Sequence, residues 1–269
     1  MVWGRSLFGN DSGRRAPAGH RAYAVGDLHG RLDLLEQMLE RIEEDDHSRP
    51  NAKTAIVFLG DLIDRGPDSA GVLERLRTYR PHDAKTIFLM GNHEEIFLRI
   101  VKGEMALLAD WLKFGGAECL QSYGIDPLEI RKLSRGEAHK LIVDRIPENH
   151  IAFISSFVDS ASFGSYLFVH AGIRPGVPLA TQSPQDLRWI RQPFLHDESD
   201  HGRIVVHGHT ISEEVEQLPN RIGIDTGAYR TGILTALAVE GEERRLLQTG
   251  REASKTDDSG SVANFSVAH

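Results

Sequence analysis

Five short segments of this 269-residue chain place aspartate, asparagine or histidine beside glycine. Carboxylate, amide and imidazole groups without thiolates suit first-row divalent ions such as manganese, iron or zinc better than the cysteine-rich sites of structural zinc. The glycines allow sharp turns and a close approach of the backbone to a metal ion or a phosphate. In chain order the segments are residues 26–30 (GDLHG), 60–66 (GDLIDRG), 91–94 (GNHE), 170–172 (HAG) and 208–210 (GHT).

Each segment follows an apolar run that is typical of a β-strand. The runs are residues 22–25, 55–59, 86–90, 166–169 and 203–206. Asp27 and His29 are two positions apart, so on an extended backbone they project to the same side. Ligands at the carboxyl ends of several strands converge on one rim of a sheet. The sequence therefore predicts one polar site that is built from all five segments.

The five segments together resemble the phosphoprotein phosphatase superfamily of metallophosphoesterases, over residues 23–247. Residues 111–116 (WLKFGG) and 224–228 (IDTGA) resemble its bacterial and phage branch of serine/threonine protein phosphatases, and HAG stands where eukaryotic members have HGG. The same motifs also resemble the symmetrical bis(5′-nucleosyl) tetraphosphatases. The resemblance implies phosphoester hydrolysis and leaves the substrate open.

The resemblance implies a dinuclear metal centre. Asp27 and His29 would bind the first ion, Asp61 would bridge both ions, and the second would be completed by Asn92, His170 and His209. Manganese is the expected metal, with iron, zinc or nickel as alternatives. Such ions lie roughly 3.5–4 Å apart and hold the attacking and leaving oxygens of an in-line displacement. A water or hydroxide that both ions share would be the nucleophile.

The resemblance also implies roles for four residues beside the metals. His93 would give a proton to the leaving oxygen, and Asp64 would orient its imidazole. Arg65 would bind phosphoryl oxygens through its guanidinium. Arg191 is the best match for a second phosphate-binding arginine, and Arg188 is its competitor.

Ordinary structural interpretations compete with these roles. Asp64 and Arg65 could form a surface ion pair. His207 alternates with His209 along the strand, so a structural or supporting role is favoured for it. Arg174 could line the substrate rim or lie in a solvated loop. Because five motifs agree, the metal-binding interpretation is favoured over turns with polar tips.

Composition is that of a soluble enzyme that does not bind duplex nucleic acid. The hydrophobic content of 40% supports a large core, and the formal net charge of −8 argues against a face that would bind duplex nucleic acid. The single cysteine, Cys119, excludes an intramolecular disulfide. Without an apolar run long enough for a membrane helix or a signal peptide, a cytoplasmic location is expected. The sequence leaves the oligomeric state open.

The pattern predicts one catalytic domain over residues 20–249. Residues 1–19 are expected to form a flexible arm and residues 250–269 a disordered tail. Apolar residues at helical spacing follow the first motif, and a helix-rich insertion is expected at about 104–157, as a structural layer or as a cap that selects substrates. Strands are expected later in the chain, at about 158–160, 165–169, 203–207, 220–224, 232–239 and 244–248.

The expected fold is α/β. Alternating strands and helices, followed by a late run of strands, favour this class. The resemblance implies a metallophosphoesterase fold in which two mixed sheets pack as a sandwich with flanking helices. The expected function is two-metal hydrolysis of phosphate monoesters, as in phosphoserine, phosphothreonine or phosphotyrosine proteins. The alternatives are hydrolysis of dinucleoside polyphosphates or other nucleotides, and a non-catalytic protein that binds metal or phosphate.

Overall fold

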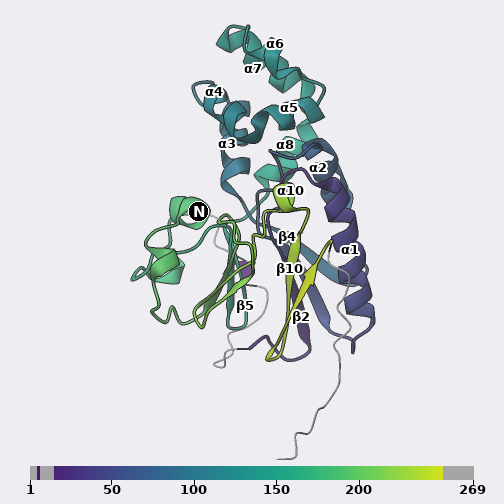
Figure 1. Cartoon of the computed structure of the whole chain (residues 1–269), viewed down its shortest axis with the longest axis vertical. Helices are drawn as coiled ribbons and strands as arrows, with labels where there is room; N and C mark the ends of the chain where they lie inside the picture. Colours follow the sequence, from purple (N-terminus) through teal and green to yellow (C-terminus); the bar gives the residue numbers. More distant parts are fainter. Residues whose placement is uncertain (1–4, 7–14, 251–269) are drawn as a thin grey trace, which may run out of the picture.

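The computed structural model describes residues 5–6 and 15–250, and within them two mixed β-sheets pack face to face (Figure 1). The five-stranded sheet has the order β11 (Glu243–Gln248), β10 (Thr235–Glu240), β2 (His20–Val25), β3 (Lys53–Phe58) and β4 (Ala84–Phe88). The six-stranded sheet has the order β1 (Arg5–Ser6), β5 (Ser160–Phe163), β6 (Tyr166–Val169), β7 (Ile204–His207), β9 (Arg221–Gly223) and β8 (Glu216–Gln217). The predicted sandwich of two mixed sheets is confirmed.

Side chains alternate between the two faces of each strand, so that each sheet contributes to a separate core on either side. In β2, Ala22 and Ala24 face the six-stranded sheet and join a core with Phe168 and Val206, whereas Tyr23 and Val25 belong to the core under the helices. A third, smaller core covers the outer face of the six-stranded sheet, where Phe194 packs near residues of β6 and β7. Both faces of each central strand are therefore buried, which explains the continuous apolar runs in the sequence.

Helices cover the outer face of the five-stranded sheet. α1 (Leu32–His47) and α2 (Ser69–Thr78) bury apolar stripes at helical spacing, and α3 (Asn92–Val101) begins in the third motif. Asp68 caps α2 by accepting the Gly71 N–H at 2.7 Å. Two short helices complete the second half of the chain, α9 (Pro184–Trp189) and α10 (Ala228–Thr231).

Between the two halves, the chain is helical where the insertion was expected. The helices are α4 (Leu108–Trp111), α5 (Ala117–Ser122), α6 (Pro127–Ile130), α7 (Arg135–Arg145) and α8 (Glu148–Ser155), and a kinked turn at Leu112–Gly116 joins α4 to α5. Helices α4 to α7 gather beyond one end of the sheets (Figure 1). The length and composition of this helical insertion do not predict which residues it contacts.

Several predicted boundaries were wrong. The strand expected at 158–160 is Ser160–Phe163, and the strand expected at 232–239 begins only at Thr235 because the short helix α10 and a left-handed Gly232 precede it. Arg5–Ser6, within the expected flexible arm, pairs with β5. The remainder of the arm before residue 15, and the expected tail after residue 250, lie outside the described residues, and the division into arm, domain and tail stays a prediction. No helix in the described part of the chain is long and apolar enough to cross a membrane.

The buried core between the sheets should carry much of the stability. Phe168 is fully buried there, whereas Phe114 is 65% exposed. We expect Phe168→Ala to lower the free energy of unfolding by about 3–5 kcal/mol, since it removes a large side chain and leaves a cavity. Phe114→Ala should change it by less than about 0.5 kcal/mol. Urea denaturation measures both, and similar losses in the two variants would contradict this assignment of the core.

Candidate active site

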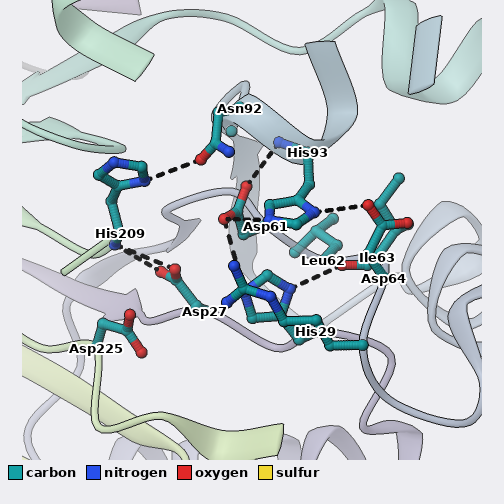
Figure 2. Close-up of polar contacts among 12 residues, drawn as sticks. Asp27, His29, Asp61, Leu62, Ile63, Asp64, Asn92, His93, His209 and Asp225 are labelled. Carbon is teal, nitrogen blue, oxygen red and sulfur yellow. Dashed lines mark hydrogen bonds and ion pairs between the residues drawn. The ribbon is translucent and has the colours of Figure 1, made fainter. Parts of the chain in front are cut away.

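The five motifs meet where strands of both sheets end. Asp27 and His29 follow β2, Asp61 follows β3, and Asn92 and His93 open α3 after β4. From the other sheet, His170 follows β6 and His209 follows β7. The labelled ones among these side chains lie close together in Figure 2, His170 contacts Asn92 at 3.0 Å, and each of the seven residues is at most 8% exposed. The structure thus brings together all six predicted metal ligands and the predicted general acid.

The loops that carry these residues have an unusual backbone. Five of the predicted site residues have positive φ: His29 (46°), Asp61 (49°), Asp64 (73°), Arg65 (66°) and His209 (63°). This region is sparsely populated by residues with a side chain, and it persists only where the surroundings impose it. Neighbouring glycines make room, since a Cβ on Gly91 would lie 2.2 Å from Asp61 Oδ1 and one on Gly208 would lie 2.0 Å from Asp27 Oδ1.

Glu94 holds two of the loops together. Its buried carboxylate accepts the backbone N–H groups of Asp61 (2.9 Å), Leu62 (2.7 Å) and Gly91 (3.0 Å). Burial and the nearby Asp61 raise its pKa to about 7. The sequence analysis gave Glu94 no role, although an acidic residue three positions after a helix N-cap is a known capping signal. Glu94 therefore fixes the position of Asp61 relative to Asn92 and His93.

The first group of possible ligands surrounds Asn92. His170 Nδ1 contacts the Leu59 carbonyl at 2.9 Å, so it carries a proton, and Nε2 faces Asn92 Oδ1 at 3.0 Å and Asp61 Oδ1 at 3.4 Å. His209 Nδ1 lies 2.9 Å from the same Asn92 oxygen. Burial alone lowers the pKa of His170, but Asp61 overcomes this and raises it. A positive charge, as a proton or a metal ion, is therefore favoured between these oxygens.

The second group surrounds His29. Its Nδ1 contacts the Ile63 carbonyl at 2.9 Å, and its Nε2 lies 3.6 Å from Asp61 Oδ2. Burial lowers the pKa of His29 to about 3, so the ring is neutral and Nε2 presents a lone pair. Arg65 donates to this lone pair at 2.9 Å. Ligand atoms of His29, Asp61 and His93 lie within 4.8 Å of one another, as do those of Asp61, His170 and His209.

Asp27 makes different contacts from the other predicted ligands. Its carboxylate accepts the backbone N–H of His209 at 3.1 and 3.3 Å and belongs to neither close group. Asp225 lies beside it (Figure 2). Burial, and then the charges of Asp225 and Asp61, raise the pKa of Asp27 well above its usual value. Asp225 lies in the stretch at 224–228 that resembles the bacterial and phage branch, but the sequence predicted no role for it.

This donor set fits divalent ions. Three buried carboxylates, Asp27, Asp61 and Asp225, disfavour one another's charge, and a bound cation removes that repulsion. In His29 and His170, the ring nitrogen opposite the one that faces Asp61 is held by a backbone carbonyl, the arrangement that orients histidine ligands in metal sites. No thiolate contributes, since Cys119 is buried in the helical core.

His93 and Asp64 form a buried pair. His93 Nδ1 lies 2.6 Å from Asp64 Oδ2 (Figure 2). Burial by itself lowers the pKa of His93, but Asp61 and Asp64 more than compensate and raise it to about 9. Asp64 occupies Nδ1 and leaves Nε2 to act on a substrate. The alternative of a surface ion pair between Asp64 and Arg65 is wrong, because Asp64 is fully buried against His93.

The three candidate phosphate-binding arginines lie in different surroundings. Arg65 is half-buried, with its guanidinium 5.0 Å from the ring centre of Tyr229, which also meets His29 edge-on at 5.3 Å. Arg191 is exposed and its Nη2 lies 3.4 Å from the His209 carbonyl. Arg188 is held in ion pairs with Asp159 (2.7 Å) and Glu95 (3.2 Å). Of the two competing arginines, Arg191 is thus the one beside the predicted ligands.

Two other candidates point away from the ligands. His207 packs against the ring of Phe194 at 5.2 Å, and burial lowers its pKa to about 4, as expected for a structural histidine. Arg174 pairs with Asp186. The sequence analysis missed Tyr229, for which alternation and motif spacing give no signal, because α10 alone brings it to His29 and Arg65.

Residues 20–231 match the family model described as calcineurin-like phosphoesterase. The chain belongs to this family. It is therefore a metal-dependent phosphoric ester hydrolase, and the resemblance to the phosphoprotein phosphatase superfamily is confirmed. Members of the family use divalent metals, and the histidine and aspartate groups described above could bind them.

Similar curated proteins act on nucleotides. The chain is 28% identical to an asymmetrical bis(5′-nucleosyl)-tetraphosphatase PrpE of Anoxybacillus flavithermus, over 79% of this chain and 88% of that protein. It is 24% identical to a symmetrical bis(5′-nucleosyl)-tetraphosphatase of Dechloromonas aromatica, over 84% of this chain and 94% of that protein. These relatives favour the nucleotide alternative over the phosphoprotein substrates that the sequence analysis put first.

Solved structures support the fold. A putative diadenosine tetraphosphatase is 20% identical with a TM-score of 0.60, over 87% of this chain and 95% of that one. A cold-active protein tyrosine phosphatase is 17% identical with a TM-score of 0.52, over 87% and 82%. Identities this low identify the shared architecture and do not discriminate between substrates.

Asp61 should be the most sensitive ligand because His29, His93 and His170 all face its carboxylate. We expect Asp61→Asn to reduce bound metal from about two ions per chain to one or none and to abolish turnover. Metal analysis after dialysis against a metal-free buffer measures this. Asp144→Asn, on the exposed face of α7, is the control and should keep its metal. Two retained ions in Asp61→Asn would exclude Asp61 as the bridge.

Proposed function

We propose that this protein hydrolyses dinucleoside polyphosphates of the bis(5′-nucleosyl) tetraphosphate type, breaking a phosphoanhydride bond. The supporting observation is the similarity to curated tetraphosphatases, which extends over 79% of the chain for one relative and 84% for another. Residues 20–249 would form the catalytic unit. A reducing compartment such as the cytoplasm is the proposed location, compatible with a chain that has one cysteine.

The proposed metal ligands divide into two sets that share Asp61. Asp27, His29 and Asp61 would hold one ion, and Asp61 together with Asn92, His170 and His209 would hold the other. Manganese is the expected metal, with iron, zinc or nickel as alternatives. When bound, such ions supply Lewis acidity and lower the pKa of the attacking water.

Arg65 and Arg191 approach the proposed metal centre from different parts of the chain. Arg65 belongs to the loop after β3, and Arg191 follows α9. A guanidinium group binds phosphoryl oxygens through two parallel N–H donors, so two arginines can hold consecutive phosphates of a polyphosphate chain. Tyr229, half-buried against Arg65, offers an aromatic face on which a nucleobase can stack.

His93 would protonate the oxygen that leaves. Its Nδ1 is engaged by Asp64, so the proton on Nε2 is the one available to a substrate. The His93 backbone N–H donates to Asp61 Oδ1 at 3.1 Å, which ties the acid to the same carboxylate that faces the metal ligands. This contact keeps the ring close to the bond that breaks.

A second candidate function is hydrolysis of phosphoserine, phosphothreonine or phosphotyrosine in proteins. The observation that favours it is the tightly held His93–Asp64 pair. A serine alkoxide is a poor leaving group that needs a proton, whereas a nucleotide phosphate leaves readily without one. A positioned general acid is therefore of more use for phosphate monoesters of alcohols than for phosphoanhydrides.

A paired assay separates the two candidates. With the manganese-loaded protein, we expect kcat/KM for diadenosine tetraphosphate to exceed that for phosphoserine, phosphothreonine and phosphotyrosine peptides by roughly tenfold or more, a difference of about 1.4 kcal/mol in transition-state binding. Asp61→Asn is the control for a contaminating hydrolase and should lose both activities. A reversed order would favour the phosphoprotein function. Absence of both activities in a metal-loaded protein would reject both.

The two candidate arginines give a matched pair of variants. Arg191→Ala should lower kcat/KM for diadenosine tetraphosphate by roughly a hundredfold, since a charge-assisted contact to a transferring phosphate is worth a few kcal/mol. Arg188→Ala should retain most activity, because Arg188 already pairs with Asp159 and Glu95. Metal content should stay unchanged in both. A loss confined to Arg188→Ala would reverse the assignment.

A further inference from the structure

The helical insertion reaches the His93–Asp64 pair through one side chain. Trp111, the last residue of α4, donates its indole N–H to Asp64 Oδ2 at 2.7 Å. His93 Nδ1 lies 2.6 Å from the same oxygen. Trp111 is 3% exposed and Asp64 is fully buried, so both contacts form away from solvent. One carboxylate oxygen thus receives donors from two parts of the chain.

The segment that follows Trp111 is shaped to make this contact. Gly115, in the kinked turn after α4, has a φ of 114°, and its carbonyl accepts the Arg65 N–H at 3.0 Å. A Cβ on Gly115 would lie 2.5 Å from Arg65 N, and a Cβ on Gly116 would lie 2.2 Å from the Trp111 indole ring. Only glycine fits at either position. Residues 111–116 therefore hold both the carboxylate of Asp64 and the backbone of Arg65.

The physical effect on Asp64 is twofold. A buried carboxylate needs hydrogen-bond donors, and the indole N–H supplies a second donor to Oδ2. The indole also limits how the carboxylate can rotate, because the Trp111 ring is itself fixed edge-on against Phe97 at 6.1 Å. The Asp64 N–H is held by Ser69 Oγ at 2.9 Å, so backbone and side chain are both immobilised. His93 then has a single orientation toward Oδ2.

We propose that Trp111 is a positioning residue for the general acid, and that residues 111–116 are the device by which the helical insertion sets the orientation of His93 and Arg65. Trp111 acts through Asp64 on His93 and does not itself touch the substrate. The inference depends on the proposed acid role of His93, but not on which phosphorylated substrate the protein hydrolyses.

The test uses Trp111→Phe, which keeps an aromatic ring and removes the indole N–H. Phenyl phosphate and p-nitrophenyl phosphate differ in how much their leaving group needs a proton, since the nitro group stabilises the phenolate. We expect kcat for phenyl phosphate to fall roughly tenfold to a hundredfold, the value of one hydrogen bond to a charged group. The kcat for p-nitrophenyl phosphate should fall much less, and KM and metal content should stay unchanged.

Trp189→Phe is the matched control. Its indole N–H also donates to a carboxylate, Glu95 Oε2, at 3.1 Å, but that carboxylate pairs with Arg188 rather than with His93. This variant should show no leaving-group bias, which means no larger fall of kcat for phenyl phosphate than for p-nitrophenyl phosphate. A similar bias in both variants, or equal losses of Trp111→Phe on the two esters, would show a general structural effect and overturn the proposal.

A double-mutant cycle tests whether Trp111 acts through His93. In a His93→Asn background, Trp111→Phe should have little further effect on phenyl phosphate turnover, because the acid is already absent. Additive losses would overturn the proposal. If His93→Asn alone shows no leaving-group bias, the acid role and the positioning role both fail. If the variants show the expected leaving-group bias but the protein does not cleave diadenosine tetraphosphate, only the nucleotide function is rejected.

A spectroscopic measurement covers the case in which Trp111→Phe does not fold. A hydrogen bond to a carboxylate moves the indole N–H proton resonance downfield, and a neutral amide acceptor does so less. In Asp64→Asn, the resonance of Trp111 should move upfield while that of Trp189 stays in place. An unmoved Trp111 resonance would overturn the proposal without any activity measurement.

Discussion

The site depends on one constraint, the burial of several negative charges at the rim where the two sheets meet. Asp27, Asp61 and Asp225 are each at most 3% exposed. Carboxylates buried this deeply must be matched by cations or donors, because desolvation strongly disfavours their charged form. The surrounding histidines, arginine and backbone N–H groups supply such cations and donors. A pair of divalent ions would balance the remaining negative charge. This fits a chain that belongs to a family of metal-dependent enzymes.

The loops are shaped by the same requirement. Asp61 and His29 bring their side chains into the cluster through left-handed backbone conformations, which are unfavourable in isolation. Glu94 offsets that cost by accepting three backbone N–H groups from two motifs. The rigid strands β2, β3 and β4 anchor the loops on one side, and β6 and β7 anchor them on the other. Paired strands therefore hold both ends of the cluster of loops that carry the proposed ligands.

The residues proposed for acid chemistry and for phosphate binding share one structural support. Asp64 and Arg65 are adjacent, and the segment from Trp111 to Gly115 contacts both of them. The helical insertion is therefore more than a layer over an apolar face, since it touches the residues proposed to protonate and to bind the substrate.

The sequence by itself determined the ligand types, the strands that precede them and the convergence of the motifs on one rim. These features are local, since strand alternation, glycine at turns and short polar motifs depend on neighbouring residues. It placed Arg191 above Arg188 only through the resemblance to a family and gave no physical reason for that order, because the ion pairs that hold Arg188 come from Asp159 and Glu95, far away in the chain. Strand boundaries were also imprecise where a short helix or a glycine turn intervened.

Only the tertiary structure decided which side chains support the proposed site residues. Glu94 under Asp61, Asp225 beside Asp27 and Trp111 on Asp64 join segments that are separated by 33, 198 and 47 positions. Such contacts follow from how sheets, loops and the insertion pack, and no local pattern encodes them. The chemistry can therefore be inferred from short motifs, whereas the orientation and charge of each group depend on distant packing.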